Sequence, residues 1–203
     1  MSNIYWSADT HIGHQSILKF MPNRPYASEE NIQAHDEWII NLWQTTVGKH
    51  DKIYFAGDLT FRKSEDARRL LEQLPGEKYL AVGNHDKAIK AHSNYFRKVA
   101  QIMEITIKPS MCDCLQEDLQ IVLCHYPLLD WSGKQQGAVM LHGQCHGTMD
   151  DFNANSVDLR FDIGIDEALA KQAGGFIDLR TLYEAILKKT GGLTPQQYAK
   201  ENY

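Results

Sequence analysis

The sequence predicts an α/β fold in which a parallel sheet is followed by a second, strand-rich half. Over residues 4–82, short apolar runs alternate with amphipathic segments in the order strand, helix, strand, helix, strand, which is typical of a parallel sheet. Beyond residue 100, five further apolar runs indicate the strands of a second sheet packed on the first. A chain of 203 residues suits one domain with a full core.

Residues 4–6 are predicted to form the first strand, and a loop is expected from there to residue 27. A helix with Ser28 as its cap follows, because apolar residues then recur close to every 3.6 positions. Gly48 is expected to end this helix. The second strand is predicted at residues 53–56.

The second predicted helix is capped by Ser64 and stopped at Pro75. The third strand follows at residues 78–82, and the segment 87–98 is expected to be helical. Parallel sheets bind ligands beyond the carboxyl ends of their strands. Polar residues that follow these strands are therefore candidates for a functional site.

The second half is predicted to hold five more strands and a final helix over residues 181–189. We expect one domain over residues 1–190, followed by a polar tail at 191–203 that is either loose or docked elsewhere. The five strands are expected at residues 102–107, 121–124, 139–141, 157–161 and 176–179.

Charge and composition limit the classes of function. The formal net charge of −5 argues against binding of extended nucleic acid, which normally requires a basic excess. It does not exclude a nucleotide-sized anion, because bound divalent cations reverse the local charge. No apolar run reaches membrane-spanning length, and the N-terminus lacks the basic region of a signal peptide. We therefore expect a cytoplasmic protein without membrane partners, and the oligomeric state stays open.

Four cysteines are too few for a disulfide-rich scaffold. Two of them, Cys124 and Cys145, lie inside apolar motif runs, so reduced thiols in a cytosolic protein are expected. The pair Cys112 and Cys114 could form half of a zinc site, but no second pair completes it. A zinc site here is the minor alternative.

Five apolar runs each end in Asp, Asn or His. Asp9 and His11 stand on alternate residues, so their side chains are expected to leave a strand end in the same direction. Mixed oxygen and nitrogen ligands suit Mn, Fe, Zn or Co better than Ca. Two such cations about 3.5–4 Å apart can clamp a phosphoryl group and activate water, which predicts hydrolysis of phosphate esters. The runs end in Asp9-Thr10-His11, Gly57-Asp58, Gly83-Asn84-His85-Asp86, His125 and Gly143-Gln144-Cys145-His146.

These five blocks, in this order over residues 4–166, resemble the calcineurin-like metallophosphoesterases. The compact bacterial and phage branch is the most similar, through the segments that begin at Asp9, Asn23 and His125. The resemblance implies a four-layer αββα sandwich, in which two mixed sheets lie back to back between helices.

The resemblance also implies a role for each block. Asp9, His11, Asp58 and His146 would hold a first ion, and Asp58 would bridge to a second ion held by Asn84, His125 and the residue at position 144. Two divalent ions are implied, with Mn expected and Fe, Zn, Co or Ni as alternatives. A hydroxide shared by the ions would attack phosphorus, with Asp58 and His85 as the catalytic residues. His85 would donate a proton to the leaving oxygen or stabilise its charge.

Two positions depart from the family pattern. Gln144 replaces the usual His, and an amide oxygen binds transition metals more weakly than imidazole. Either the site is tuned to harder ions or to weak occupancy by the second ion, or His142 compensates from an unfavourable register, or position 144 carries an inactivating substitution. Phe61 replaces an Asp of the protein phosphatases, which argues against a protein substrate.

The sequence thus predicts a metal-dependent phosphodiesterase for a nucleotide or cyclic nucleotide, with Arg62, Arg24 and His14 as substrate contacts. One alternative is a phosphomonoesterase for small metabolites. The other is a catalytically weakened metal-binding protein, which Gln144 suggests. Trp131 follows His125 closely and is a hypothetical stacking partner for a nucleobase at the rim of the cleft.

Overall fold

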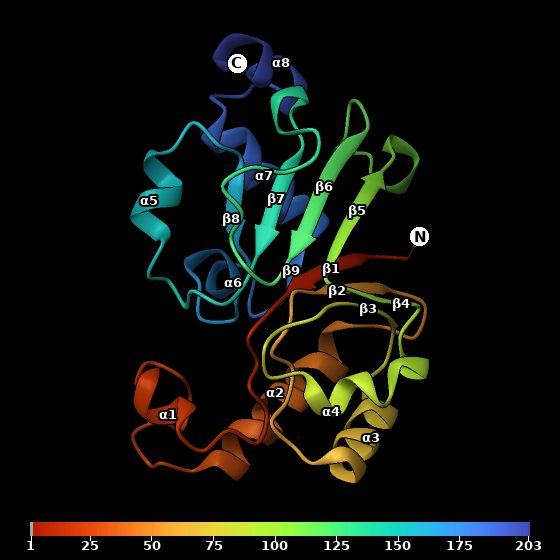
Figure 1. Cartoon of the computed structure of the whole chain (residues 1–203), viewed down its shortest axis with the longest axis vertical. Coiled ribbons are helices and arrows are strands. Elements are labelled where there is room, and N and C mark those ends of the chain that lie inside the picture. The colour runs from red at the N-terminus through yellow and green to blue at the C-terminus, as the bar shows by residue number, and fades with distance from the viewer. Residues whose placement is uncertain (1) are drawn as a thin grey trace.

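The computed structural model describes residues 2–203 and contains two β-sheets (Figure 1). The first sheet has the strand order β4-β3-β2-β1-β9. Its first four strands are parallel, and β9 pairs antiparallel to β1. These strands are β1 (Ile4–Ser7), β2 (Lys52–Phe55), β3 (Glu77–Ala81), β4 (Lys98–Ala100) and β9 (Ile177–Asp178).

The second sheet has the order β5-β6-β7-β8. The pair β5 and β6 is antiparallel, whereas β7 runs parallel to both β6 and β8. Two mixed sheets with several helices confirm the predicted α/β class. The strands are β5 (Ile102–Ile107), β6 (Leu119–Cys124), β7 (Val139–His142) and β8 (Arg160–Asp162).

The main core lies between the two sheets. Trp6 of β1, Leu123 of β6 and Leu141 of β7 belong to one buried apolar cluster. Helix α7 (Leu179–Lys189) adds Leu182 and Ile186 to the same cluster. Burial of large apolar side chains is the dominant stabilising term in folding, so this shared core fixes the two sheets relative to each other.

Helices cover the face of the first sheet that points away from the second sheet. In Figure 1 these helices lie below the first sheet. They are α2 (Ile32–Thr46), α3 (Ser64–Gln73) and α4 (Lys87–Lys90), and their apolar residues form a second buried cluster with β2 and β3. The predicted caps are wrong. Asn31, not Ser28, accepts the N–H of Ala34, and Ser64 is the first residue of α3 without a capping hydrogen bond.

A connecting loop, rather than a helix, packs on the outer face of β6 and β7. Val122 and Met140 contact Trp131 and Ala138 there, next to the 3-10 helix η3 (Lys134–Gln136). Trp131 is buried, and its indole N–H donates to the carbonyl of Ala138 at 2.9 Å. The hypothesis that Trp131 stacks on a nucleobase is therefore wrong.

Several short elements escaped prediction, because isolated helices of about one turn carry no periodic signal. Strand β8 is also shorter than expected and begins at Arg160. The unpredicted elements are α1 (Ile17–Phe20), β4, η2 (Pro109–Met111), α5 (Asp150–Asn155) and α6 (Ala168–Gln172), whereas the segment 87–98 expected to be helical holds α4 and the 3-10 helix η1 (Ser93–Tyr95).

The polar tail is helical and docked. Helix α8 (Pro195–Asn202) begins with a capping box: the side chain of Thr194 accepts the N–H of Gln197, and the side chain of Gln197 accepts the N–H of Thr194. The helix packs against η3, and a Cβ on Gly137 would lie 2.5 Å from the carbonyl oxygen of Pro195. Gly137 is thus required for this close approach.

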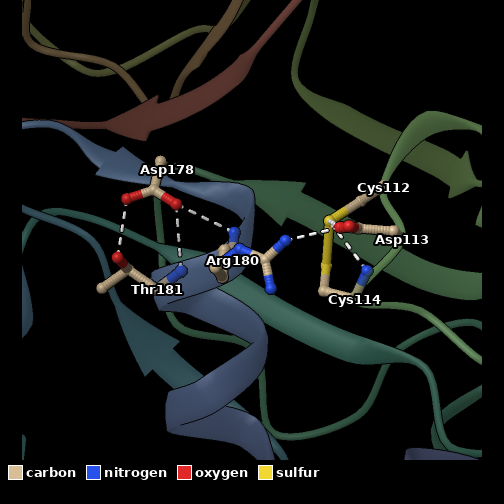
Figure 2. Close-up of a disulfide and its surroundings, with 6 residues drawn as sticks. All are labelled: Cys112, Asp113, Cys114, Asp178, Arg180 and Thr181. Atoms are coloured by element: carbon tan, nitrogen blue, oxygen red, sulfur yellow. Dashed lines mark hydrogen bonds and ion pairs between the residues drawn. A yellow bond between two sulfur atoms is a disulfide. The ribbon is translucent and has the colours of Figure 1, made fainter.

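Figure 2 shows Cys112 and Cys114 joined by a disulfide, which corrects the expectation of reduced thiols at these positions. The intervening Asp113 forms an ion pair with Arg180 of α7. Asp178 caps that helix by accepting the N–H groups of Arg180 and Thr181. A bonded pair cannot serve as two zinc thiolates. Among residues 2–203, no helix is long and apolar enough to cross a membrane.

Candidate metal centre

The five sequence blocks meet at one edge of the fold, where β1, β2, β3, β6 and β7 end. Asp9 belongs to two groups of side chains whose ligand atoms lie within 4.8 Å of one another. One group contains Asp9, His11 and His146, and the other contains Asp9, Asp58 and His125. The predicted convergence of distant segments is therefore present.

The backbone at these positions is strained. Asp9 (φ 58°) and His11 (φ 52°) adopt left-handed conformations after β1 has ended at Ser7. The alternate-residue argument from an extended strand is therefore wrong, and two left-handed residues bring the side chains together instead. Such conformations are unfavourable for residues other than glycine and occur most often at functional sites. Asp58, Gln144 and His146 share this conformation, with φ of 57°, 70° and 47°.

Glycines next to the polar residues permit close approach. Gly57 has a φ of 86°, and a Cβ there would lie 2.6 Å from Nδ1 of His125. A Cβ on Gly143 would lie 2.5 Å from Oδ2 of Asp9. Because any larger residue would collide with these side chains, the glycines belong to the site and not merely to turns.

We call Asp9, His11 and His146 the Asp9 cluster. The Nε2 atom of His11 lies 3.9 Å from Oδ1 of Asp9 and 3.8 Å from Oδ2 of Asp58. Both Oδ1 of Asp9 and Nε2 of His11 are buried without a hydrogen-bond partner among the described residues. Burial lowers the pKa of His11 to about 2, so the ring is neutral and one of its two nitrogens has a lone pair for a ligand. Burial, with Asp162 and Asp58 nearby, raises the pKa of Asp9 well above its usual value.

We call Asn84, His125 and Gln144 the His125 cluster. The Nε2 atom of His125 lies 3.0 Å from Oδ1 of Asn84, 2.9 Å from Oε1 of Gln144 and 3.7 Å from Oδ2 of Asp58. The Nδ1 atom of His125 is 2.7 Å from the carbonyl of Ala56, which requires a proton on Nδ1. This hydrogen bond turns Nε2 towards the three oxygens, as second-layer partners of metal-binding histidines do.

His142 does not compensate for Gln144. Its Nδ1 lies 2.8 Å from the carbonyl of Gly143 and must donate a proton there. The amide of Asn153 faces Nε2 at 3.2 Å, while its own oxygen accepts from Arg160. Both ring nitrogens of His142 are thus engaged. Gln144 itself points into the His125 cluster and presents an oxygen in place of an imidazole.

Asp58 lies between the two clusters and is held by a second carboxylate. Asp86 accepts the N–H groups of Asp58, Leu59 and Gly83 at 2.8–3.0 Å. The N–H of His85 donates to Oδ1 of Asp58 at 2.9 Å. Because Oδ1 of Asp58 is engaged, Oδ2 is directed at the histidines. Asp86, the last residue of the Gly83–Asp86 block, connects the loop after β2 to the loop after β3.

Arg24 lies behind the Asp9 cluster instead of facing the cleft as a substrate contact. It is 6% exposed and forms a two-pronged ion pair with Asp166, with N···O distances of 2.7 and 2.6 Å. It also donates to the carbonyls of Asp9 and Thr10, at 2.6 and 3.0 Å. Asp166 in turn lies 2.8 Å from Nδ1 of His146. No sequence motif marks Asp166 as part of the site.

His85, Phe61 and His14 form a stack beside the clusters. The ring centroids of Phe61 lie 4.3 Å from those of His85 and 3.9 Å from those of His14. The side chain of His85 is 43% exposed, and its Nε2 lies 3.9 Å from Oδ2 of Asp58. Arg62 is 28% exposed and donates to Asp36 at 2.9 Å. Phe61 thus occupies one face of His85, where stacking orients the ring.

The centre offers the donors that a cation would need. Oδ1 of Asp9 and both ring nitrogens of His11 are buried and have no partner within residues 2–203, although buried polar atoms in proteins are almost always paired. Carboxylate, imidazole and amide donors surround the same point from both clusters. The side chains present therefore fit divalent cations with mixed oxygen and nitrogen preference.

No protein-family model matches the sequence. The uncharacterised protein MJ1445 of Methanocaldococcus jannaschii is 40% identical over 89 residues, or 43% of this chain and 48% of that protein. This chain thus spans about half the length of that relative. The gene 66 proteins of Mycobacterium phages D29 and L5 are 27% and 26% identical, and the matches cover 72% and 73% of this chain and 79% and 80% of theirs.

A crystal structure of the protein of unknown function AQ665 from Aquifex aeolicus matches 91% of this chain and 100% of that chain. The TM-score is 0.65 at 19% sequence identity. The likeness is one of fold alone, and these relatives bring no assigned activity to the metal centre.

Proposed function

We propose that this chain is a metal-dependent phosphoesterase of the calcineurin-like metallophosphoesterase family that hydrolyses phosphodiesters of nucleotides or cyclic nucleotides. The observation that carries the proposal is the convergence of the Asp9 and His125 clusters on Asp58, with Oδ1 of Asp9 and both ring nitrogens of His11 buried and unpaired. Burial of a polar atom without a partner is costly, and a bound cation would offset that cost here.

The donor set fits two cations, one at each cluster. Asp9, His11, Asp58 and His146 would hold the first, and Asp58 with Asn84, His125 and Gln144 would hold the second. Mn²⁺ is expected, with Fe, Zn, Co or Ni as alternatives. When bound, such a pair neutralises charge on a phosphoryl group and lowers the pKa of water.

His85 is the residue that would act on the leaving group. Its exposed ring lies beside Asp58, within reach of a substrate bound at the two clusters. From there it donates a proton to the leaving oxygen or stabilises the negative charge that develops on it. Phe61 orients the ring by stacking, in place of the carboxylate partner that the sequence lacks.

The arrangement of positive charge favours a diester over a monoester. A diester carries one negative charge on its phosphoryl group, whereas a monoester carries up to two. Arg24 is bound to Asp166 behind the site, and Arg62 is paired with Asp36 at its side. Arg24 is therefore not available to balance a second charge at the phosphorus, and Arg62 lines a cavity beside His85 instead of the two clusters.

The test compares bis(4-nitrophenyl) phosphate with 4-nitrophenyl phosphate after removal of metals by chelation and addition of Mn²⁺. We expect hydrolysis to require Mn²⁺ and kcat/KM to be at least about 10-fold higher for the diester, which corresponds to roughly 1.4 kcal/mol in the barrier. The His85→Asn variant should lose about 100-fold in kcat with unchanged metal content. The exposed Lys90 on α4 provides the matched control, Lys90→Ala.

Each rival gives a different result. Preference for the monoester would identify a phosphomonoesterase of small metabolites. Failure to cleave either ester, with two ions bound per chain, would identify a metal-binding protein without catalytic function. The Gln144→His variant distinguishes a weakened enzyme from the latter, because only the enzyme would gain activity.

A further inference from the structure

A cavity of about 450 Å³ opens beside His85, between the loop after β2 and the first turn of α4. His85 and Asn84 line it, so the cavity adjoins the candidate metal centre. Phe61 forms another part of its wall and stacks on His85. If the oxygen of a leaving group lies next to His85, the rest of that leaving group can occupy this cavity. A volume of this size is typical of sites for small organic ligands.

The charge of the cavity is unlike that of the whole chain. Arg62 and Lys87 line it, and no Asp or Glu is found among its described lining residues. The chain as a whole carries a net charge of −5. The larger cavity of about 710 Å³ between α5, α6 and α7 differs, because four carboxylates line it together with three cationic side chains.

The side chains of Arg62 and Lys87 both have donor groups available to bind an anion. Within residues 2–203, Arg62 uses only Nη2, towards Asp36, and its Nε and Nη1 groups have no hydrogen bond to protein. Lys87 is exposed and has no ion pair in the same part of the chain. A guanidinium with two unused donors and a free ammonium are the groups that recognise phosphate.

We propose that this cavity is the leaving-group subsite and that it selects leaving groups which carry a second anionic substituent, a phosphate above all. The inference rests on the proposed phosphodiesterase function. Under it, Arg62 and Lys87 bind the distal phosphate, and Phe61 packs against the sugar or base that connects it to the scissile ester. The two cations serve specificity, whereas the metal clusters and His85 serve cleavage.

The experiment compares a dinucleoside monophosphate with two derivatives that carry one additional terminal phosphate, on either nucleoside. Analysis of the products shows which nucleoside leaves. We expect a KM about 10-fold lower when the extra phosphate is on the leaving nucleoside, and no such gain when it is on the other. In Lys87→Ala this ratio of KM values should fall close to unity, whereas Lys90→Ala, on the same short helix, should retain it.

A binding measurement provides a readout that does not depend on cleavage. Chelator-treated protein is titrated with a nucleoside monophosphate and with the corresponding nucleoside, and NMR shifts of α4 and the loop after β2 are followed. The monophosphate should bind at least about 10-fold more tightly than the nucleoside. Lys87→Ala should abolish this difference, and Lys90→Ala should not.

The outcomes separate the two proposals. If the simple diester is cleaved but the distal phosphate brings no gain in KM or binding, the subsite inference is wrong and the phosphodiesterase function stands. If no ester is cleaved, the proposed function is wrong. In that case the NMR titration decides whether the cavity binds phosphorylated ligands, and equal binding of nucleoside and monophosphate would overturn the subsite.

Discussion

The Asp9 cluster and the His125 cluster share Asp58 but are supported in different ways. Behind the Asp9 cluster, Arg24 makes contacts at 2.6–3.0 Å to two backbone carbonyls and to Asp166, which holds His146. The ring of His125 is oriented by one hydrogen bond to the carbonyl of Ala56. The other two members of the His125 cluster, Asn84 and Gln144, contribute neutral amide oxygens.

This difference indicates that the Asp9 cluster is preorganised, whereas the His125 cluster can adapt its geometry. A carboxylate with fixed imidazoles binds a transition metal tightly, and second-layer bonds hold that geometry in place. Two amide oxygens bind more weakly and leave a less charged site. We therefore expect tight binding of one ion at the Asp9 cluster and weaker binding of a second at the His125 cluster.

The largest effect is expected from Asp58→Asn, because it removes the carboxylate that lies between the two clusters. Oδ2 of Asp58 lies 3.7–3.9 Å from the Nε2 atoms of His11, His85 and His125. We expect diester hydrolysis to fall on the order of 1,000-fold and both ions to be lost. Metal content by mass spectrometry and kcat check this, and retention of both ions would refute the shared role.

The second prediction concerns the support of the Asp9 cluster. Arg24→Gln leaves Asp166 buried without its cation and frees His146, so affinity for the first Mn²⁺ should fall about 10- to 100-fold. Isothermal titration calorimetry measures the two affinities separately. The second affinity should change much less than the first.

Two further variants control for loss of fold. Asp166→Asn keeps the shape of the side chain and should lower the first affinity less than Arg24→Gln does. Arg68→Gln alters an exposed arginine on α3 and should change neither affinity. Equal losses at both clusters after Arg24→Gln would show that Arg24 supports the whole fold and not one cluster.

The convergence of the side chains in both clusters could be predicted from the sequence because each side chain follows a strand end. Apolar runs such as residues 53–56 define parallel strands, and parallel strands present their carboxyl ends at one edge. Gly57 and Gly83 mark where the chain must turn closely past Asp58. These patterns are local in the sequence, so they can be recognised without knowledge of the tertiary structure.

The supporting contacts could not be predicted, because they join distant segments. Arg24 and Asp166 are separated by 142 positions, and nothing near either residue indicates the other. Arg24 therefore resembled an exposed cation beside a proline. In the same way, the burial of Trp131 depends on its packing against β6 and β7, and the left-handed backbone of Asp9 depends on the whole edge of the sheet.

The third prediction tests the weakness of the His125 cluster. Gln144→His replaces an amide oxygen with an imidazole, so affinity for the second Mn²⁺ should rise about 10-fold and the two affinities should become more alike. Calorimetric titration at fixed pH measures the change. An unchanged second affinity would mean that the position of Gln144, and not its chemistry, limits binding there.

The smallest effect concerns Asp162, which lies behind the Asp9 cluster. A Cβ on Gly164 would lie 3.1 Å from Oδ1 of Asp162 and 3.2 Å from Oδ2 of Asp9. Burial raises the pKa of Asp162 to about 7, far above the ordinary value of about 3.9. Between these values the folded metal-free chain keeps a proton that the unfolded chain has released. Stability therefore falls as pH rises from about 4 to 7.

Asp162→Asn removes this titration, so position 162 should no longer make the free energy of unfolding depend on pH. In urea denaturation with chelator present, the variant should gain stability relative to the wild type as pH rises from about 4 to 7, with little further gain above that range. His11 titrates in both proteins and cancels from the difference. A difference independent of pH would mean that Asp162 is ionised in the metal-free fold. Its negative charge would then stand behind Asp9 and strengthen the Asp9 cluster as a cation site.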